Sequence, residues 1–354
     1  MARLTRPVVI FGFAFALVAA WLAVTLVGAN TTGPLAGFVD RLSTFTTIFL
    51  GIFIEAAPFL LLGTLGSGLV EVFFNKDDLN RLIPRNPLAG AIVGGLMGLF
   101  FPVCECGVVP LTRRLFKKGL PLSVGVSFLL AAPVMNPIVI ASTLAAFGVG
   151  PVLFLRLGLT LLIAVITGLV FARQTHPERL LNATAWAEIS GGSIDSPPLS
   201  AKQTGEGPGV GIFARPSLRE GLPRVLTIAA DEFFEMGRYL ILGSLLASFM
   251  QTVVPQSALL AVSSGPVISV LAMITLAVIL SVCSTVDAFI ALAFAGTFTT
   301  GSVLAFLVFG PMVDIKSTLM FLRVFNRKAV VYLILLPLAK TILFSVFINL
   351  NTAW

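Results

Sequence analysis

The sequence predicts an all-helical membrane protein that crosses the bilayer several times. Apolar residues make up 57% of the 354 residues, charged residues only 11%, and the mean hydropathy is +1.02. These values lie far outside the range of soluble domains. Several apolar stretches exceed the roughly 20 residues that a helix needs to cross a bilayer. Because backbone groups in lipid must be satisfied internally, helices are the expected elements.

The basic residues gather in short loops, which indicates membrane topology and not nucleic-acid binding. The chain has 23 Lys and Arg against 16 Asp and Glu, a net charge of +7. Since basic loops stay in the cytoplasm, Arg3 and Arg6 place the N-terminus there, in a bacterial cytoplasmic membrane. No nucleotide-binding loop or cofactor motif is present, so neither an enzyme nor an ATP-driven pump is expected, and no cofactor.

We expect four parts along the chain: an extra N-terminal transmembrane helix and loop (1–42), a first membrane repeat (43–173), a flexible cytoplasmic linker (174–228) and a second membrane repeat (229–354). Clusters of Gly, Ser and Pro without an apolar period predict the linker. His176, the single histidine, falls in it, where a solvated side chain is expected.

Residues 88–116 predict a re-entrant hairpin. The stretch is too short for two crossings, which need roughly 40 residues, and Pro102 and Pro110 interrupt it. We expect it to enter from the cytoplasm, turn near residues 104–107 and return. Such irregular backbone at membrane depth is tolerated only where protein or a cavity surrounds it.

Residues 120–148 predict a broken helix. The stretch is long enough to cross, but Pro133 and Pro137 lie within it. Proline lacks an amide donor and displaces its predecessor from helical geometry, so we expect an unwound turn near Asn136. Gly63, Gly66 and Gly68, in the preceding helix, are expected to allow close helix packing.

The second half repeats landmarks of the first at a spacing of about 180 residues. Since the first unit ends in the cytoplasm, the second begins there, so the two units have inverted topology. Such repeats with paired broken elements are typical of secondary transporters, whose substrate binds near the membrane midplane. Three pairs carry the repeat: Glu55 with Glu235, Cys104 with Cys283, and Asn136 with Asp314.

The distribution of charge agrees with inversion. The loops 254–265 and 299–302, which inversion places outside, contain no Lys or Arg. Only four of the basic residues fall outside the cytoplasmic face by this assignment: Arg41, Arg156, Lys316 and Lys340.

The chemistry-bearing residues concentrate at the two hairpin tips. Cys104 and Cys106 flank Glu105 at the first, and Cys283 and Asp287 lie at the second. If the tips meet at the midplane, all three thiols of the chain meet. Three cysteines cannot form a paired disulfide framework, so the alternatives are functional thiols or small side chains that only pack.

The signatures Pro102-Val-Cys-Glu-Cys-Gly-Val-Val-Pro110, Gly119-Leu-Pro121 and Ser127-Phe-Leu-Leu-Ala-Ala-Pro-Val-Met-Asn-Pro137 resemble the predicted-permease family that includes the ArsP-type arsenical permeases. The resemblance covers about residues 44–172 and 233–350. It implies a permease, with Cys104 and Cys106 as the family's cysteine pair, and characterised relatives export trivalent arsenic compounds. The participation of Cys283 follows from the repeat alone.

Thiol chemistry favours the same substrate class. Trivalent arsenic prefers a trigonal site of three sulfurs, whereas zinc usually takes four Cys or His ligands. We therefore expect proton-coupled efflux of trivalent arsenic or a similar thiophilic metalloid through Cys104, Cys106 and Cys283. The alternative is a transporter or channel for a divalent metal ion or a small sulfur-containing anion, with redox-active thiols.

Polar residues at membrane depth complete the expected site, because ionisable groups there are costly and are functional candidates. Glu105, Asn136, Asp287 and Asp314 are expected to contact substrate. For Asn136 the alternative is that it only satisfies backbone groups freed at the break.

Glu55 and Glu235 are the expected carriers of the coupling proton, since burial makes a carboxyl group able to bind and release protons near neutral pH. The structural alternative for the acids is ion pairing, of Asp314 with Lys316 and of Glu235 with Arg238. A third interpretation is a structural membrane subunit. Homo-oligomerisation or an accessory protein bound to the linker would then complete it.

Overall fold

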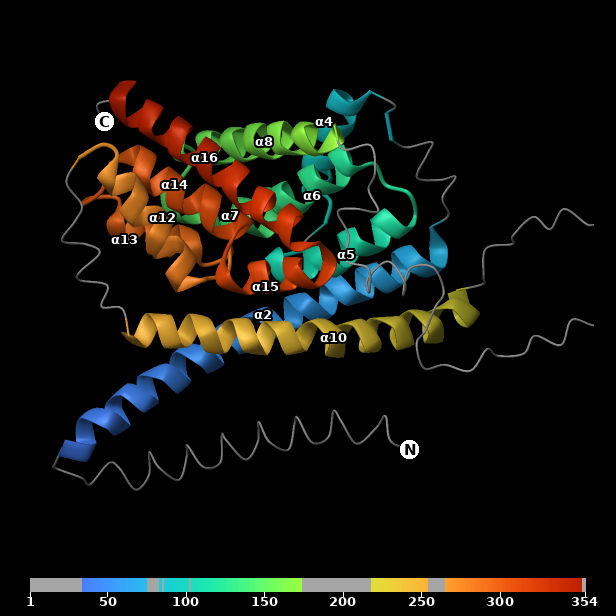
Figure 1. Cartoon of the computed structure of the whole chain (residues 1–354), viewed down its shortest axis with the longest axis horizontal. Coiled ribbons are helices and arrows are strands. Elements are labelled where there is room, and N and C mark those ends of the chain that lie inside the picture. The colour runs from blue at the N-terminus through green and yellow to red at the C-terminus, as the bar shows by residue number, and fades with distance from the viewer. Residues whose placement is uncertain are drawn as a thin grey trace, which may run out of the picture.

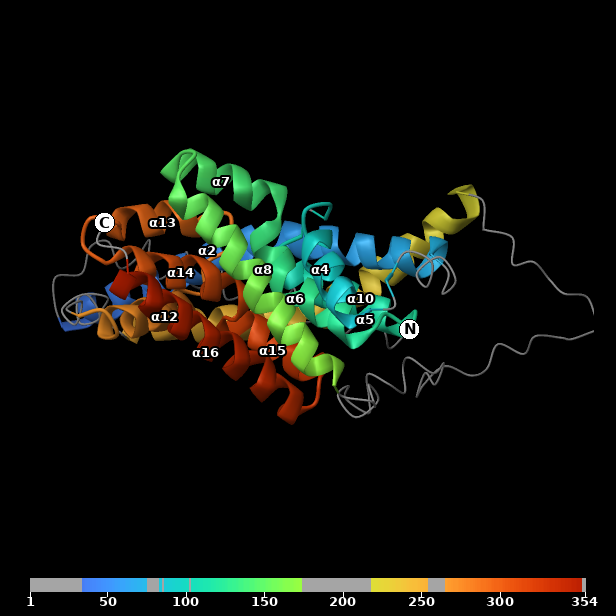
Figure 2. The same ribbon diagram turned by 90° about the horizontal axis from the view of Figure 1, so that it is seen from above.

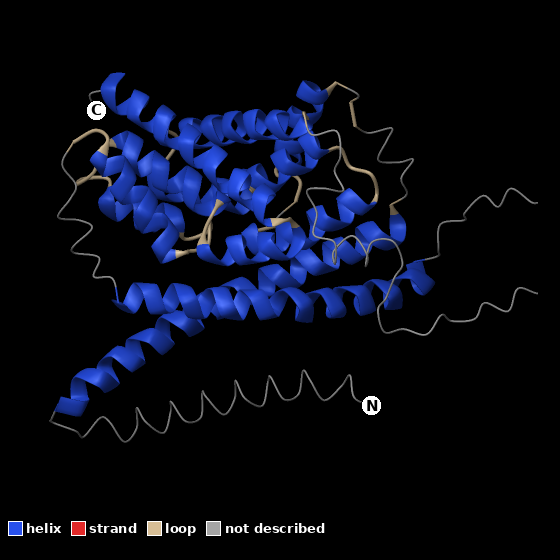
Figure 3. Ribbon diagram, viewed as in Figure 1, coloured by secondary structure: helices blue, strands red, loops and turns tan. Residues whose placement is uncertain are grey.

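A computed structural model describes residues 34–74, 83–84, 86–101, 103–173, 218–253 and 265–351. Every helix and strand assignment in these residues is helical, as the composition predicts (Figure 3). The expected first transmembrane helix, most of the linker (174–217) and the loop 254–264 lie outside the described residues.

Six helices are long and apolar enough to cross a membrane, by length and composition, which confirms a multi-pass membrane protein. Two of the six are each made of two consecutive helices. The spans belong to α2 (Pro34–Phe73), α6 and α7 (Leu122–Met135, Pro137–Phe147), α8 (Pro151–Ala172), α10 (Leu218–Val253), α14 and α15 (Thr300–Met312, Ile315–Val324) and α16 (Arg327–Asn351).

The two longest helices, α2 and α10, lie side by side (Figure 1). With 40 and 36 residues they extend for roughly 60 and 54 Å, well beyond the roughly 30 Å hydrocarbon core. Helix α2 begins at Pro34 and not near residue 43, and Pro58 does not end it. Helix α10 begins at Leu218, so residues 218–228 of the expected linker are helical.

Two pairs of short helices carry the cysteines at their turns. In the first pair, α4 (Pro87–Met97) and α5 (Glu105–Lys117), the described residues between the helices are non-helical. In the second, α12 (Ile268–Leu280) and α13 (Asp287–Phe294), residues 281–286 form the connection. All four helices are shorter than a membrane crossing requires.

The first broken helix is interrupted at one residue, Asn136, between α6 and α7. The unwound turn that the two prolines predict is therefore shorter than expected. Pro133 remains inside α6, and Pro137 occupies the first turn of α7, where a missing amide proton costs nothing. The second break, between α14 and α15, consists of Val313 and Asp314.

The order of helices is the same in both halves: a long helix, two short helices, a broken pair and a closing helix. In the middle lie α6, all of whose residues are buried, and α14, which is nearly as buried. Large apolar side chains such as Ile54, Phe154 and Phe347 are instead exposed on the outer helices. An apolar exterior is what a helix bundle presents to lipid. Figure 2 shows α7 of the first half beside α13 of the second.

Candidate functional site

The two hairpin turns meet in a buried group of three donor side chains. Cys104 is the N-terminal cap residue of α5, in extended conformation, and Glu105 is the first residue of that helix. Cys283 comes from the connection between α12 and α13. One ligand atom from each of the three lies within 4.8 Å of the other two. Cysteines 179 positions apart in sequence are thus neighbours, which is the meeting of the tips that the repeat predicts.

Cys106 lies at the edge of this group and not in it. Its thiol is fully buried in the first turn of α5 and interacts with that of Cys104, which also interacts with that of Cys283. The closest donor set is therefore two sulfurs and the carboxylate of Glu105. This differs from the expected set of three sulfurs, since Glu105 takes the place of Cys106.

A buried lysine, Lys316, places a positive charge beside two buried carboxyl groups of the site. The Lys316 ammonium lies 3.5 Å from Glu105 Oε1 and 3.5 Å from Asp314 Oδ2, with all three side chains at most 3% exposed. The pairing of Asp314 with Lys316 that the sequence left open is present. Among the described residues, neither oxygen of Glu105 has a hydrogen-bond partner, and the same holds for Asp314 Oδ2. Unsatisfied buried carboxylates are rare in native folds because each costs free energy.

The side chain of Asn136, an expected site residue, forms hydrogen bonds with two backbone groups. Its Oδ1 accepts a hydrogen bond from the Ile138 amide at 2.8 Å, which caps α7, and its Nδ2 donates to the Val103 carbonyl at 3.2 Å. The backbone role that the sequence left open is therefore the observed one. Through Val103 it also holds the segment that leads into Cys104.

Asp287, the second hairpin-tip acid, forms a buried ion pair with Arg156. Arg156 Nη2 lies 2.6 Å from Asp287 Oδ2, and Nη1 donates to Thr143 Oγ1 at 2.7 Å. The pair joins α8 to α13, so it links the two halves. Arg156 is fully buried, and this ion pair was not among those expected from the sequence. The available signal was a charged residue inside the apolar run 151–172, which needs a partner.

The two expected proton carriers have different surroundings. Glu55 is half-buried and its Oε1 accepts a hydrogen bond from Thr285 Oγ1, in the second hairpin turn, at 3.0 Å. Glu235 lies 3.1 Å from Arg113 Nη1 and 2.8 Å from Arg323 Nη2.

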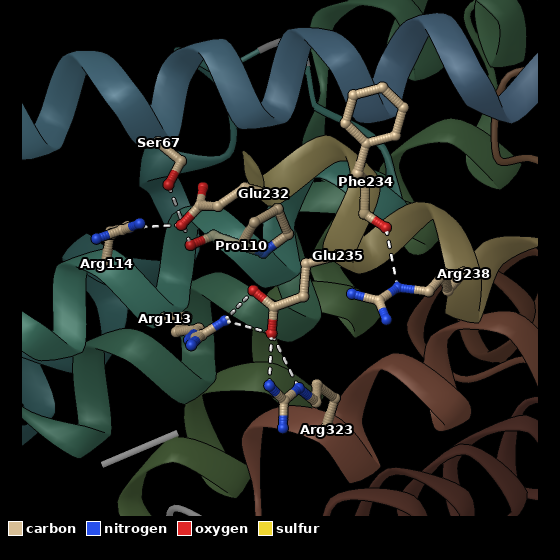
Figure 4. Close-up of polar contacts among 9 residues, drawn as sticks. All are labelled: Ser67, Pro110, Arg113, Arg114, Glu232, Phe234, Glu235, Arg238 and Arg323. Atoms are coloured by element: carbon tan, nitrogen blue, oxygen red, sulfur yellow. Dashed lines mark hydrogen bonds and ion pairs between the residues drawn. The ribbon is translucent and has the colours of Figure 1, made fainter. Parts of the chain in front are cut away.

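The predicted pair of Glu235 with Arg238 is wrong. Arg238 is exposed and its Nε donates to the Phe234 carbonyl at 3.4 Å, and Figure 4 marks no contact between it and Glu235. The guanidinium groups of α5 and α15 reach Glu235 from neighbouring helices instead.

Further ion pairs extend this contact between α2, α5 and α10. Arg114 binds Glu232 through its Nε and lies 3.7 Å from Glu71, while the Lys118 ammonium donates to the Glu71 carbonyl oxygen at 2.8 Å. The sequence showed these residues only as loop charges. The sequence did not indicate which acidic residues these basic residues contact. Glu232 lies more than a hundred residues from Arg114, and the contacts with Glu71 depend on how α2 packs against α5.

Known proteins resemble the chain over nearly its whole length. Residues 41–350 match the family described as predicted permease, of ArsP type. The UPF0718 protein YcgR of Bacillus subtilis (strain 168) is 41% identical over 302 residues, which cover 84% of this chain and 95% of that protein. A putative two-component membrane permease complex subunit of Streptococcus mutans is 36% identical over 282 residues, or 79% of this chain and 87% of that protein.

No solved structure matches the chain. The family match nevertheless includes both cysteine-bearing turns, both broken helices and both long helices. The relatives named as permeases are transporters and not enzymes, in agreement with the sequence. The chain therefore belongs to the ArsP-type predicted permease family.

Proposed function

We propose that this permease exports trivalent arsenic or a similar thiophilic metalloid, with Cys104, Cys106 and Cys283 as its binding thiols and protons as the coupling ion. The supporting observation is the meeting of Cys104 and Cys283 in a buried group drawn from both halves of the chain. A binding group shared by two halves changes its exposure when one half moves against the other, as alternating access requires.

Sulfur chemistry supports the metalloid. Trivalent arsenic is a soft centre that binds thiolates, and the Cys104 thiol interacts with both other thiols. The alternative, that these cysteines only pack, does not account for their position beside an unsatisfied buried carboxylate.

The proposed architecture is a pair of inverted repeats, residues 43–173 and 229–354, each with a re-entrant hairpin and a broken helix. It is supported by the identical order of helices in the two halves and by the short helices on either side of each cysteine-bearing turn. The contacts across the halves also support it, because each hairpin-tip acid pairs with a buried cation of the other half: Glu105 with Lys316, and Asp287 with Arg156.

For proton coupling, Glu55 is better supported than Glu235. The partner of Glu55 is the neutral hydroxyl of Thr285. This hydrogen bond does not fix the charge of Glu55, so the carboxyl group can bind and release a proton. Glu235 is held by two guanidinium groups, which do not lose their protons. We assign Glu55 to proton transfer and Glu235 to the contact between α10, α5 and α15.

The test is arsenite accumulation in cells that express the wild type or Cys104→Ala, Cys106→Ala or Cys283→Ala at equal membrane level. The expected result is higher cellular arsenic in each variant than in wild type. Asp231→Asn, an exposed acid on α10, is the matched control and is expected to match wild type. Unchanged arsenic tolerance in all three cysteine variants contradicts the proposal.

An accessory protein is a further part of the proposal. The Streptococcus mutans relative is named as the subunit of a two-component complex, which supports a partner for this chain as well. Affinity purification from the native membrane in mild detergent tests this point, with a stoichiometric second protein as the expected result and a homogeneous single chain as the contrary one.

A further inference from the structure

We infer that Cys104, Cys283 and Glu105 form a binding site for a soft divalent metal cation of the Zn²⁺ or Cd²⁺ type. The site uses two of the thiols of the proposed metalloid site, so it rests on the same place in the fold. It differs in its third donor, which is a carboxylate, and in the positive charge of its ligand.

The spacing of the donors fits such an ion. A tetrahedral zinc ion lies about 2.3 Å from sulfur and about 2.1 Å from a carboxylate oxygen, which places its donors roughly 3.6–3.8 Å apart. The two sulfurs and one oxygen already lie within 4.8 Å of one another. The separations therefore exceed those of a bound ion by no more than about 1 Å.

The carboxylate of Glu105 points to a ligand independently of the spacing. The side chain is 2% exposed, and neither oxygen receives a hydrogen bond from the described residues. Its ion-pair partner, Lys316, is 3.5 Å away and is shared with Asp314. One carboxylate oxygen is thus free to bind an ion beside the two sulfurs.

The charges around the site are compatible with a metal bound as its neutral dithiolate. Two buried carboxylates, Glu105 and Asp314, share the single ammonium of Lys316. The other fully buried cation of the described region, Arg156, is paired with Asp287. With both carboxyl groups ionised, the site holds one more negative charge than the ammonium balances. A divalent cation that displaces two thiol protons adds no net charge to this apolar environment, where uncompensated charge is expensive. Lys316 retains Asp314 as its partner when the metal takes Glu105.

Binding has a proton stoichiometry that separates the two ligand classes. A metal ion that binds two thiols displaces two protons: M²⁺ plus two R–SH gives M(SR)₂ plus two H⁺. Arsenous acid, As(OH)₃, condenses with the same thiols and releases water, with no net proton. Proton release on binding thus identifies a divalent cation at the thiols.

The experiment is a Cd²⁺ titration of the purified, reduced full-length protein in detergent, followed by thiolate-to-cadmium charge-transfer absorption and by a pH indicator in weak buffer. We expect one Cd²⁺ per chain and two protons per Cd²⁺. Cys104→Ser and Cys283→Ser are expected to abolish the absorption. Glu105→Gln is expected to weaken binding by about tenfold or more, as loss of a metal-site group does, and Asp231→Asn to match wild type.

Titration of the wild type with Co²⁺ keeps the inference testable if a serine variant does not fold, because the charge-transfer intensity reports the number of bound thiolates. Two are expected, and three or none overturn the site. Cd²⁺ binding that is unchanged in Cys283→Ser or Glu105→Gln also overturns it. Arsenite binding measured on the same samples separates the proposals: Cd²⁺ without arsenite binding contradicts the metalloid function alone, and arsenite without Cd²⁺ binding contradicts this inference alone.

Discussion

Arg156 and Asp287, 131 residues apart, form a salt bridge of 2.6 Å between side chains that are at most 3% exposed. The contact joins α8 of the first half to α13 of the second. Because a guanidinium group does not lose its proton, the buried Arg156 always requires a partner for its charge.

Loss of Asp287 is expected to destabilise the protein strongly. In Asp287→Ala the Arg156 charge is left buried without its carboxylate, at a cost of about 3–5 kcal/mol. The measurement is the apparent melting temperature in detergent by size-exclusion chromatography after heating. The double variant Arg156→Met, Asp287→Leu is expected to recover much of the loss, since an apolar pair carries no desolvation cost. A single variant as stable as wild type contradicts this account.

Gly63 is expected to tolerate no side chain. A β-carbon at Gly63 would collide with the backbone of Gly107, one residue after Cys106, whereas one at Gly66 would meet nothing within 4 Å. Gly63→Ala should therefore cost about 1–3 kcal/mol through overpacking and weaken ligand binding at the thiols. Gly66→Ala, on the same helix, is the matched control. Equal melting temperatures for the two variants would show that α2 moves freely from α5.

Asn136 is expected to act as a positioning residue for Cys104. Asn136→Asp keeps the oxygen that caps α7 but loses the donor to the Val103 carbonyl. We expect metal or arsenite affinity reduced by roughly tenfold, the effect of disturbing a group behind a ligand. The new carboxyl group is fully buried and faces the Val103 carbonyl oxygen, so it also lowers stability. Asn136→Ala loses the cap without adding a charge and should cost about 1–2 kcal/mol. Calorimetric titration and thermal unfolding of both variants separate positioning from stability.

Removal of Glu235 is expected to loosen α10 from α5 and α15. Glu235→Gln leaves Arg113, only 5% exposed, and Arg323 without the carboxylate that both contact, at a cost of about 1–3 kcal/mol. Arg238→Gln is the control, because Arg238 is exposed and contacts only a backbone carbonyl. Hydrogen exchange of residues 218–253 is the direct readout. Faster exchange in Glu235→Gln alone supports the contact, and equal exchange in both variants excludes it.

Composition and spacing were sufficient to predict the class of protein and the meeting of two cysteine-bearing turns. The apolar content determines helices that cross a membrane, and the prolines beside Asn136 mark a break that the structure places at that residue. The spacing of Cys104 and Cys283 predicted that two distant turns meet, on the hypothesis that a duplicated unit places equivalent residues in equivalent positions. These predictions rest on the local sequence and on its spacing.

The partners of the charged residues were decided by tertiary structure alone. Whether Glu235 contacts Arg238 on its own helix or Arg113 and Arg323 on two others depends on how helices pack, which no spacing encodes. The same holds for the donor group. The sequence predicted Cys106 as its third member, whereas the structure places Glu105 there, because the start of α5 sets the direction of each side chain. In an apolar interior a charge takes whichever opposite charge the fold brings within reach. The sequence by itself therefore determined that Cys104 and Cys283 come together, and the packing of α5 against α15 decided that a carboxylate and a lysine stand beside them.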